Sequence, residues 1–473
     1  MKLVNEVVDK KKKFPTKVIQ FGEGNFLRAF IDWQIQKMNE QKIFEGGVAI
    51  VQPLANGMVK MLSEQENYYT VLLEGLLNGK KIQSTEIITC INETINPYED
   101  YRSYLALADN KDIEIIVSNT TEAGIAFDEN DVFSEEKIPN TFPAKLTILL
   151  YRRFKNKLKG FHIIPCELIN HGGKVLKETI FKYLDLWKLD EEFKLWLENE
   201  NYFYSTLVDR IVPGYPKDSA EEIFEKIGYR DNLLVKAEPF LLFVIEGDEK
   251  LLEVFPLTKA GLNVLLVKDM QPYRERKVRL LNAPHTALAL TGLIAGIETV
   301  GEAMKDEDFS KFINDLMYKE ISPKIDLDKK ELADYSESIK ERFNNPFVKH
   351  ALSSISLNSV SKFKARLLPT LNSYLQEDKL VKRIVLALSA LITIYGNDTK
   401  ITPFDTQDIL NKFEKLKLEK DYIKAVLACT DFWGVDLSSY PLLVASVIEN
   451  VESIKNGNIR KLIQELNKEE ICF

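Results

Sequence analysis

The stretch Ile19-Gln-Phe-Gly-Glu-Gly-Asn-Phe-Leu-Arg-Ala-Phe30 decides the fold, because it joins an apolar run to a helical pattern through two glycines. The apolar run Lys17–Phe21 predicts a buried strand, and the apolar spacing of residues 25–38 predicts a helix. A second apolar run, Gly47–Gln52, predicts the next strand. Strand, glycine turn, helix and strand make a βαβ unit, which implies a parallel sheet.

Further apolar runs along the first half of the chain extend this pattern. Ile113–Ser118 and Phe161–Cys166 predict two more strands, and Pro239–Glu246 and Leu262–Val267 predict two later ones. Asn78-Gly79 is a strong hairpin signal between two strand-like segments, so we expect an antiparallel hairpin inserted in the α/β domain. Helices are expected at about 99–108, 143–158, 174–187 and 190–199.

The pattern changes past residue 270. Residues 1–270 contain 15 of the 21 glycines and residues 271–473 contain the other 6, about half the density. The sequence therefore predicts an α/β domain over 1–270 and an all-helical domain over 271–473, with a boundary near Gln271-Pro272. Long helical patterns are present in the second part at 287–298, 306–321, 328–343, 379–395, 406–418 and 440–462.

Composition limits the classes of function. The chain has 473 residues, enough for two domains, and its 45% hydrophobic and 28% charged residues are ordinary for soluble globular proteins. A net charge of −8 argues against a nucleic-acid partner, and we interpret the basic run Lys10–Lys13 as a solvated terminus. No apolar run is long enough to span a membrane, and no signal peptide is visible.

Cysteine and histidine spacing points to a reduced protein without a metal site. Cys90, Cys166, Cys429 and Cys472 show no paired spacing, which suits a reducing cytoplasm. The four histidines form no HxxxH pair and the chain has no CxxC motif. We therefore expect no bound metal.

Two glycines at the first strand-to-helix turn suggest a dinucleotide. Glycines there let the backbone approach a pyrophosphate, and the helix N-terminus attracts its charge. The full fingerprint has a small residue at position 27, where this chain has Leu27, so a tight turn without a ligand is the alternative. The place between a strand and a helix favours the dinucleotide. We assign cofactor contacts here to Phe21, Gly22, Gly24, Asn25 and Phe26.

Two other strand ends complete the predicted cofactor site. Gln52 ends the second strand, where it can hydrogen-bond a ribose hydroxyl and brings no positive charge for a 2′-phosphate, so NAD is favoured. Ser118-Asn-Thr-Thr-Glu-Ala-Gly124 ends a later strand, at the edge where parallel sheets bind ligands. We predict cofactor contacts from Ser118 and Thr121, with a polar loop that binds nothing as the alternative.

The segment Lys277-Val-Arg-Leu-Leu-Asn-Ala-Pro-His285 holds an amine, an amide and an imidazole at spacings of five and three. At ~100° per residue, these side chains fall within an arc of about 140° on a helix, so one face could present them to one molecule. Lys277 is a candidate acid/base, Asn282 a candidate donor to a developing oxyanion, and His285 a candidate ligand of a substrate hydroxyl. The alternative is an exposed lysine, a capping asparagine and a structural histidine.

Neighbouring residues qualify this prediction. Pro284 predicts a kink, or a helix restart with the proline in its first turn. Tyr273-x-x-x-Lys277 matches the catalytic pair of short-chain dehydrogenases, but in that family little chain follows the pair, whereas here residues 278–473 follow. Nearby arginines could lower the pKa of the lysine. They are Arg274, Arg276 and Arg279.

The glycine turn, the Lys277-x4-Asn282-x2-His285 pattern and the two-domain layout together resemble the mannitol dehydrogenase family of polyol-specific long-chain dehydrogenases. The resemblance covers nearly the whole chain. The segments that carry it are 19–30, 118–124, 164–169, 205–211, 277–285 and 342–346.

This resemblance implies a metal-independent enzyme whose Rossmann domain binds NAD and whose helical domain binds the substrate. It implies that Lys277 is the catalytic lysine, that Asn282 stabilises an oxyanion and that His285 binds substrate. Asp209 matches a family-motif aspartate beside the site, and Lys362 matches a substrate-contacting lysine.

Two departures from the family pattern concern the substrate. Leu168 stands where mannitol dehydrogenases have a second oxyanion asparagine, and Ser354 where they have an arginine. Both fit a sugar-acid branch, whose substrate carboxylate needs a cation. We expect NADH-dependent reduction of the keto group of D-tagaturonate to D-altronate; fructuronate reduction, polyol oxidation and a non-catalytic dinucleotide-binding protein are the alternatives. Candidate carboxylate ligands are Lys362, which is favoured, Arg366, Arg342 and Lys349.

Overall fold

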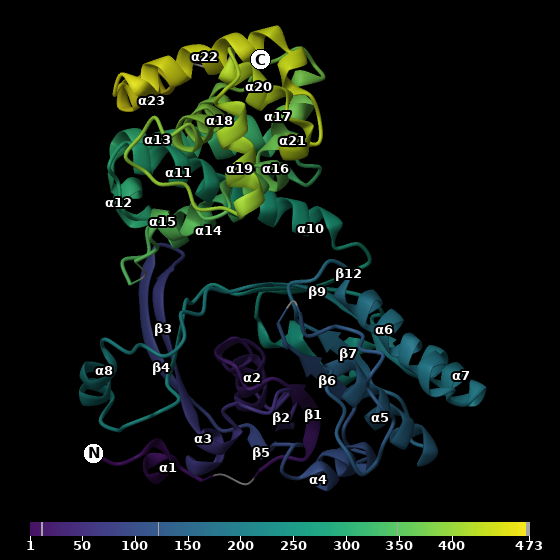
Figure 1. The fold of residues 1–473 in the computed structure, drawn as a ribbon. Coiled ribbons are helices and arrows are strands. Elements are labelled where there is room, and N and C mark those ends of the chain that lie inside the picture. Colours follow the sequence, from purple (N-terminus) through teal and green to yellow (C-terminus); the bar gives the residue numbers. More distant parts are fainter. Residues whose placement is uncertain (11–12, 122, 348, 470–473) are drawn as a thin grey trace. The chain divides into compact units, whose positions relative to one another are not determined.

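The computed structural model describes residues 1–10, 13–121, 123–347 and 349–469 (Figure 1). Lys11 and Lys12 of the predicted basic run, Glu122 of the strand-end loop and Cys472 lie outside the described residues. The chain divides into two compact units. The first unit comprises Met1–Gly75 and Lys81–Met270, and the second comprises Leu76–Lys80 and Gln271–Phe473.

A six-stranded sheet forms the centre of the first unit, and every pair of neighbouring strands in it is parallel. The strand order β5-β2-β1-β6-β7-β8 is that of a doubly wound dinucleotide-binding sheet, whose order reverses between β1 and β6. The carboxyl ends of these two strands therefore border the ligand crevice of such a fold. The strands are β1 (Thr16–Phe21), β2 (Gly47–Val51), β5 (Ile91–Ile95), β6 (Ile115–Ser118), β7 (His162–Pro165) and β8 (Tyr202–Phe203).

Alternate side chains of β1 enter two different cores, as the period of a strand requires. Val18 packs in a core with α2 (Asn25–Glu40), and Ile19 and Phe21 pack in a second core on the other face. Helices therefore cover both faces of the sheet (Figure 1). The second core takes side chains from α4 (Tyr101–Ala106), α5 (Phe142–Lys155), α6 (Gly172–Trp187) and α7 (Glu191–Glu200).

The predicted hairpin is confirmed. Asn78 and Gly79 both have positive φ, 53° and 71°, as the two central residues of a type I′ turn require. The hairpin strands β3 (Tyr69–Leu77) and β4 (Lys80–Ile88) form a three-stranded sheet with β10 (Val235–Ala237). Another three-stranded sheet contains β9 (Ser205–Asp209), β11 (Leu242–Glu246) and β12 (Val264–Val267).

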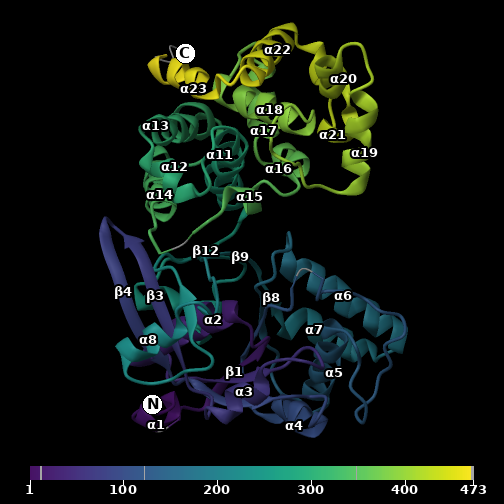
Figure 2. The same ribbon diagram turned by 60° about the vertical axis from the view of Figure 1, so that its left-hand side comes forward.

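The second unit is helical apart from the hairpin tip. Its core is α18 (Lys382–Tyr395), buried from its second residue onward, which contacts α11 (Ala283–Ile294) and α22 (Pro441–Lys455) (Figure 2). The single helix predicted over 440–462 is wrong, because Gly457 at φ 79° ends α22 before α23 (Ile459–Lys468). Other helices are α13 (Glu307–Asp315), α14 (Lys329–Phe343), α15 (Leu352–Ile355), α16 (Ser359–Arg366), α17 (Leu368–Leu375) and α19 (Gln407–Leu416).

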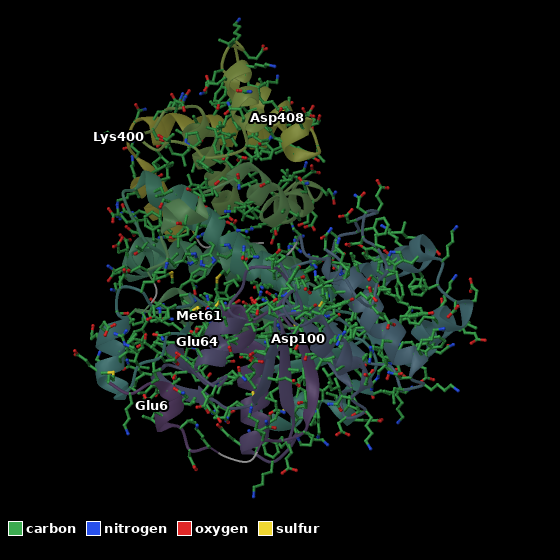
Figure 3. All side chains as sticks on the ribbon, turned by 60° about the horizontal axis from the view of Figure 1, so that its bottom comes forward. Glu6, Met61, Glu64, Asp100, Lys400 and Asp408 are labelled. Atoms are coloured by element: carbon green, nitrogen blue, oxygen red, sulfur yellow. The ribbon has the colours of Figure 1, made fainter. Side chains whose placement is uncertain are left out.

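Acidic and basic side chains cover the outside of both units (Figure 3). Asp100 of the first unit and Lys400 and Asp408 of the second are exposed examples. None of the helices in the described part of the chain is both long enough and apolar enough to cross a membrane.

Candidate functional site

The turn after β1 needs glycine for two different reasons. Gly22 has φ +117°, and a Cβ there would lie 2.9 Å from the carbonyl oxygen of Asn119, so a larger residue does not fit between the ends of β1 and β6. Gly24 is the N-cap of α2, and no atom lies within 4 Å of a Cβ built on it. The first glycine therefore closes the turn, and the second leaves open space beside the helix N-terminus.

The first turn of α2 presents backbone N–H groups to this open space. No side chain caps the helix, so the N–H groups of its first turn keep their hydrogen-bonding capacity. Leu27 is 1% exposed, and its Cδ1 atom lies 3.4 Å from the Cβ position of Gly22. Leucine thus packs beneath the turn where the fingerprint has a small residue, and the N–H groups stay available to a phosphate.

The side chains next to the two glycines already pack against or hydrogen-bond other side chains of the protein. Phe21 is fully buried and packs against Tyr104 and Phe142, so it can contact a cofactor only through its backbone. Phe26 stacks on Phe30 at 4.9 Å between ring centroids. Asn25 accepts a hydrogen bond from Arg28, whose Nη2 lies 2.7 Å from its Oδ1.

Gln52 organises the loop that follows β2. It is 2% exposed, and its Nε2 donates to the carbonyl oxygens of Leu54 at 2.8 Å and Ala55 at 3.2 Å. Its Oε1 accepts from the backbone N–H of Val59 at 3.3 Å. The amide therefore shapes the loop, and its contact with a ribose stays a prediction.

A cavity of about 550 Å³ opens at the carboxyl ends of β2 and β5. Glu93, Glu99 and Asp100 bring three acidic side chains to its lining, and Lys60 brings one basic side chain. The polar lining also includes Gln52. This excess of negative charge favours a ligand with free hydroxyls over one with an added phosphate.

The loop after β6 is held by Glu167, which the sequence did not single out as a site residue. Its carboxylate accepts from Ser118 Oγ at 3.1 Å, and from the backbone N–H and Oγ1 of Thr120, both at 2.9 Å. Burial raises the pKa of Glu167 above its ordinary value. Thr121 has φ 74°, an uncommon conformation for threonine. Cofactor contacts from Ser118 and Thr121 stay predictions.

Two family-related positions of the first unit differ sharply in exposure. Leu168, just beyond β7, is 62% exposed, which is unusual for a large apolar side chain. Asp209, the last residue of β9, is 5% exposed and pairs in register with Leu242. Asp209 is therefore held by the sheet, and its role beside a substrate stays a prediction.

A π-helical segment, Lys277–Asn282, connects α10 (Gln271–Arg276) to α11 in the second unit. The N–H of Ala283 donates to the carbonyl of Val278, a five-residue spacing. A turn with this spacing is wider than an α-helical turn, so residues 277 and 282 lie closer in angle than the about 140° that separates them in an α-helix. Lys277 and Asn282 are both half-buried. The backbone of this turn therefore favours one face for both residues, and their joint catalytic role stays a prediction.

The π-helical segment also accounts for Pro284. The proline lies in the first turn of α11, where its missing N–H and fixed φ are tolerated. The helical backbone continues without a break from α10 through the π-helical segment into α11, so the helix does not restart at the proline. π-Helical turns are rare and occur often at functional sites.

His285 is 8% exposed and packs among aromatic rings. Its ring lies 4.1 Å from that of Phe343 between centroids, at 30°, and 5.0 Å from that of His350, at 71°. Burial lowers the pKa of His350. This packing fixes the imidazole of His285, and its contact with a substrate hydroxyl stays a prediction.

Two of the nearby arginines have partners elsewhere in the second unit. Arg276 pairs with Glu331 and lies over the ring of Tyr335, 4.2 Å from its centroid. Arg279 Nη1 donates to the carbonyl of Lys324 at 2.6 Å. These contacts hold both guanidinium groups in structural roles.

Helix α16 brings two of the predicted cations next to α11 and α15. Lys362 Nζ donates to the carbonyl of Ile355 at 2.8 Å. Arg366 Nη1 donates to Thr286 Oγ1 at 3.1 Å and to the carbonyl of Asn282 at 3.5 Å. Of the other candidates, Arg342 is buried on α14 and Lys349 is exposed.

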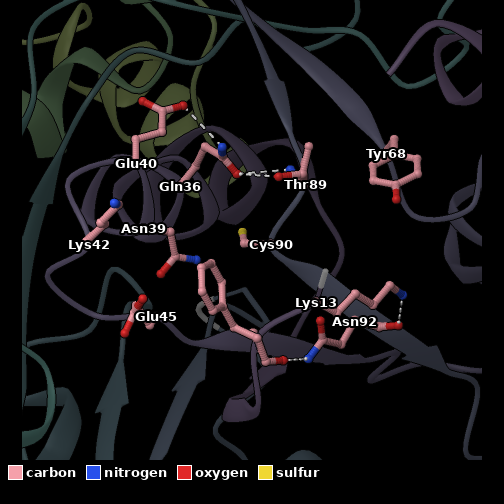
Figure 4. A pocket seen from close by; sticks show the side chains of 12 residues that line it. Lys13, Gln36, Asn39, Glu40, Lys42, Glu45, Tyr68, Thr89, Cys90 and Asn92 are labelled. Carbon is pink, nitrogen blue, oxygen red and sulfur yellow. Dashed lines mark hydrogen bonds between the residues drawn. The ribbon is translucent and has the colours of Figure 1, made fainter. Parts of the chain in front are cut away.

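A second cavity, of about 260 Å³, lies at the amino end of β2 (Figure 4). Its polar side chains mostly bind one another or backbone: Gln36 contacts Glu40 and Thr89, and Asn92 donates to Phe14. Among the residues that the structure describes, no group of three or more His, Cys, Asp or Glu side chains is arranged to hold a metal ion.

Comparison with known families accounts for both units. Residues 16–256 match the mannitol dehydrogenase Rossmann domain, and residues 269–455 match the mannitol dehydrogenase C-terminal domain. The chain belongs to the mannitol dehydrogenase family. Its family membership agrees with the strand order of the first unit and the helical second unit.

Relatives at higher identity share one name. A protein of Bacteroides thetaiotaomicron named altronate oxidoreductase is 44% identical over 477 residues, which cover 98% of this chain and 99% of that protein. A Bacillus subtilis protein of the same name is 40% identical over 474 residues, with 98% of each chain covered.

Solved structures show the same fold at lower identity. A D-sorbitol dehydrogenase aligns with a TM-score of 0.82 and 22% identity over 95% of both chains. Pseudomonas fluorescens mannitol 2-dehydrogenase, in a ternary complex with NAD and D-mannitol, aligns with a TM-score of 0.69 and 20% identity over 97% of this chain and 95% of that one.

Proposed function

We propose that the chain is an NAD(H)-dependent altronate oxidoreductase that interconverts D-tagaturonate and D-altronate in hexuronate catabolism. The observation that carries the proposal is 44% identity, over nearly the full length of both chains, to a protein of that name. The two departures from mannitol dehydrogenases, Leu168 and Ser354, support a sugar acid over a simple polyol.

The first unit is the part that binds the cofactor in this proposal. The open space beside Gly24 and the uncapped N-terminus of α2 fit a pyrophosphate. The 550 Å³ cavity at the ends of β2 and β5 fits the adenosine half. Its excess of acidic side chains disfavours a 2′-phosphate, which supports NAD over NADP.

The second unit supplies the acid/base chemistry. Bound NADH supplies the hydride that reduces the keto carbon. Lys277 delivers the proton to the carbonyl oxygen, and in the reverse direction it takes the hydroxyl proton. The amide of Asn282, at the other end of the same π-helical segment, donates to the same oxygen as negative charge develops. His285 orients a substrate hydroxyl from its fixed place beside Phe343.

The substrate assignment is tested by following NADH oxidation with D-tagaturonate, D-fructuronate and D-fructose in parallel, each with and without a chelator. We expect D-tagaturonate to give the highest kcat/KM, with no effect of the chelator. Higher kcat/KM with D-fructuronate would make the chain a fructuronate reductase, and with D-fructose a polyol dehydrogenase. Loss of activity with the chelator would exclude the metal-independent reaction.

Replacement of the catalytic lysine is the corresponding residue test. Lys277→Ala should lower kcat by roughly two to four orders of magnitude, because the proton donor is lost. NADH binding, measured by fluorescence titration, should remain, since Lys277 belongs to the other unit. Lys330→Ala, an exposed lysine of the same unit, is the matched control and should keep its activity. Near-normal turnover of Lys277→Ala would remove the lysine from the mechanism.

A further inference from the structure

Helix α16 presents two cations on one face. Lys362 and Arg366 are four residues apart, so their side chains are neighbours on the helix surface. Both are half-buried, and Arg366 lies against the first turn of α11 through its contact with Thr286. Because Arg366 also reaches the carbonyl of Asn282, the pair lies beside the π-helical turn that carries Lys277.

The fold does not neutralise these two charges. Within the described residues, neither Lys362 nor Arg366 forms an ion pair with a carboxylate. Burial lowers the pKa of both groups, and the charge of Arg366 lowers the pKa of Lys362 further, although Asp405 acts in the opposite direction. Asp405 itself is engaged by the hydroxyl of Tyr395 at 2.7 Å and the N–H of Thr406 at 2.8 Å.

The geometry of Arg366 leaves part of its guanidinium available. Its Nη1 makes both contacts with α11, and within the described residues no acceptor is bonded to its Nε or Nη2. Those two atoms form the edge of a guanidinium that binds a carboxylate through two parallel hydrogen bonds. Lys362 adds a second positive charge on the same face but already donates to Ile355.

We propose that Arg366, assisted by Lys362, binds the carboxylate of the substrate and thereby selects sugar acids over neutral ketoses. The inference rests on the proposed function, and it ranks Arg366 above Lys362 as the direct ligand. A neutral substrate would leave two half-buried cations without a counter-charge, whereas a carboxylate neutralises them. Arg366 is thus a specificity residue, distinct from the proton donor Lys277.

The test compares an acid with its neutral counterpart. D-Tagatose has a hydroxymethyl group where D-tagaturonate has its carboxylate, so the ratio of their kcat/KM values isolates that group. Arg366→Met should lower this ratio about 100-fold, as loss of two hydrogen bonds to a charged group implies, mostly through KM for the acid. Arg366→Lys should give an intermediate ratio, because the lysine ammonium keeps the positive charge but cannot make the two parallel hydrogen bonds of a guanidinium. Lys364→Met, an exposed lysine on the same helix, is the matched control and should leave the ratio unchanged.

If turnover of D-tagatose is too slow to measure, a binding constant replaces the ratio of kcat/KM values. The Kd of D-altronate for the enzyme–NADH complex, measured by calorimetry, should rise about 100-fold in Arg366→Met and remain unchanged in Lys364→Met. An unchanged ratio and an unchanged Kd in folded Arg366→Met would overturn the inference while the proposed function stands. If the wild-type enzyme prefers another sugar acid, the proposed function fails, and the ratio for that acid and its neutral counterpart tests Arg366 independently.

Discussion

Two arginines of the helical unit, Arg383 and Arg366, differ in whether carboxylates balance their positive charge. Arg383, on α18, has a 2% exposed side chain, and its Nη2 pairs with Asp315 at 2.9 Å and its Nη1 with Glu320 at 3.4 Å. Arg366, on α16, has neutral partners, the hydroxyl of Thr286 and a backbone carbonyl. One charge is balanced within the fold, and the other is not.

The comparison extends to the π-helical turns. Glu320 belongs to a second π-helical segment, Leu316–Ile321, and its carboxylate accepts from the N–H groups of Arg383 and Ile384 at the start of α18. The polar group on that turn is therefore used to join two helices. The first π-helical turn instead carries the half-buried residues Lys277 and Asn282. The same local geometry supports the core in one place and a candidate site in the other.

The largest effect on folding is expected from Arg383→Met. The substitution leaves Glu320 buried without its cation, whereas Asp315 keeps its pairs with Lys311 and Lys319. Breaking a buried pair in this way destabilises proteins by about 3–5 kcal/mol. Urea denaturation should show this loss. Arg460→Met removes an exposed pair with Asp306 and should change stability by less than about 1 kcal/mol. If the two substitutions lowered the free energy of unfolding equally, burial would not explain how much these ion pairs stabilise the fold.

The first unit also buries an ionisable carboxyl group. Asp32 is fully buried, and its Oδ2 accepts from Tyr69 Oη at 2.7 Å and Gln20 Nε2 at 3.3 Å. Its Oδ1 and Gln20 Oε1 are buried acceptors without a hydrogen-bond partner among the described residues. Burial raises the pKa of Asp32 to about 7, from a usual value of 3.8.

Asp32→Asn should therefore remove a pH dependence of stability. The folded state retains the Asp32 proton that the unfolded chain releases, so this contribution is complete below pH 3.8 and is lost as the pH rises towards 7. The slope reaches at most about 1.4 kcal/mol per pH unit. Urea denaturation between pH 5 and 8 should show a flatter profile for Asp32→Asn than for wild type. Asp218→Asn, at an exposed position, should keep the wild-type slope, and identical profiles for all three proteins would place an ionised carboxylate at position 32.

Much of the first unit could be predicted from local patterns. The continuous apolar runs of β1, β2, β6 and β7 are typical of buried parallel strands, and Asn78-Gly79 specifies its turn directly. Strands β5, β8, β9 and β10 were not predicted. They are short or alternate with polar residues, and their pairing partners are distant in sequence, so long-range contacts determine them.

For the candidate site, the sequence predicted which residues take part but not their local geometry or contacts. Spacing suggested Lys277 and Asn282, but an α-helix separates them by about 140°. No sequence pattern indicated the π-helical turn that contains both residues and contacts α14 and α16. Glu167 holds the loop after β6 through contacts that no sequence motif indicates. The family pattern favoured Lys362 over Arg366 as the ligand of the substrate carboxylate. The contacts of the two cations reverse that order in our proposal.

A smaller effect on folding than that of Arg383→Met is expected from Arg366→Met, which tests the comparison of the two arginines directly. Removing this cation breaks two hydrogen bonds to neutral groups, Thr286 and the carbonyl of Asn282, and leaves no carboxylate unpaired. It also removes the repulsion that lowers the pKa of Lys362. The free energy of unfolding should therefore fall by less than the about 3–5 kcal/mol expected of Arg383→Met, because no buried carboxylate loses its cation and the relieved repulsion offsets part of the loss of two hydrogen bonds. A loss in urea denaturation as large as that of Arg383→Met would show that Arg366 supports the fold, and the two arginines would then differ in partners but not in role.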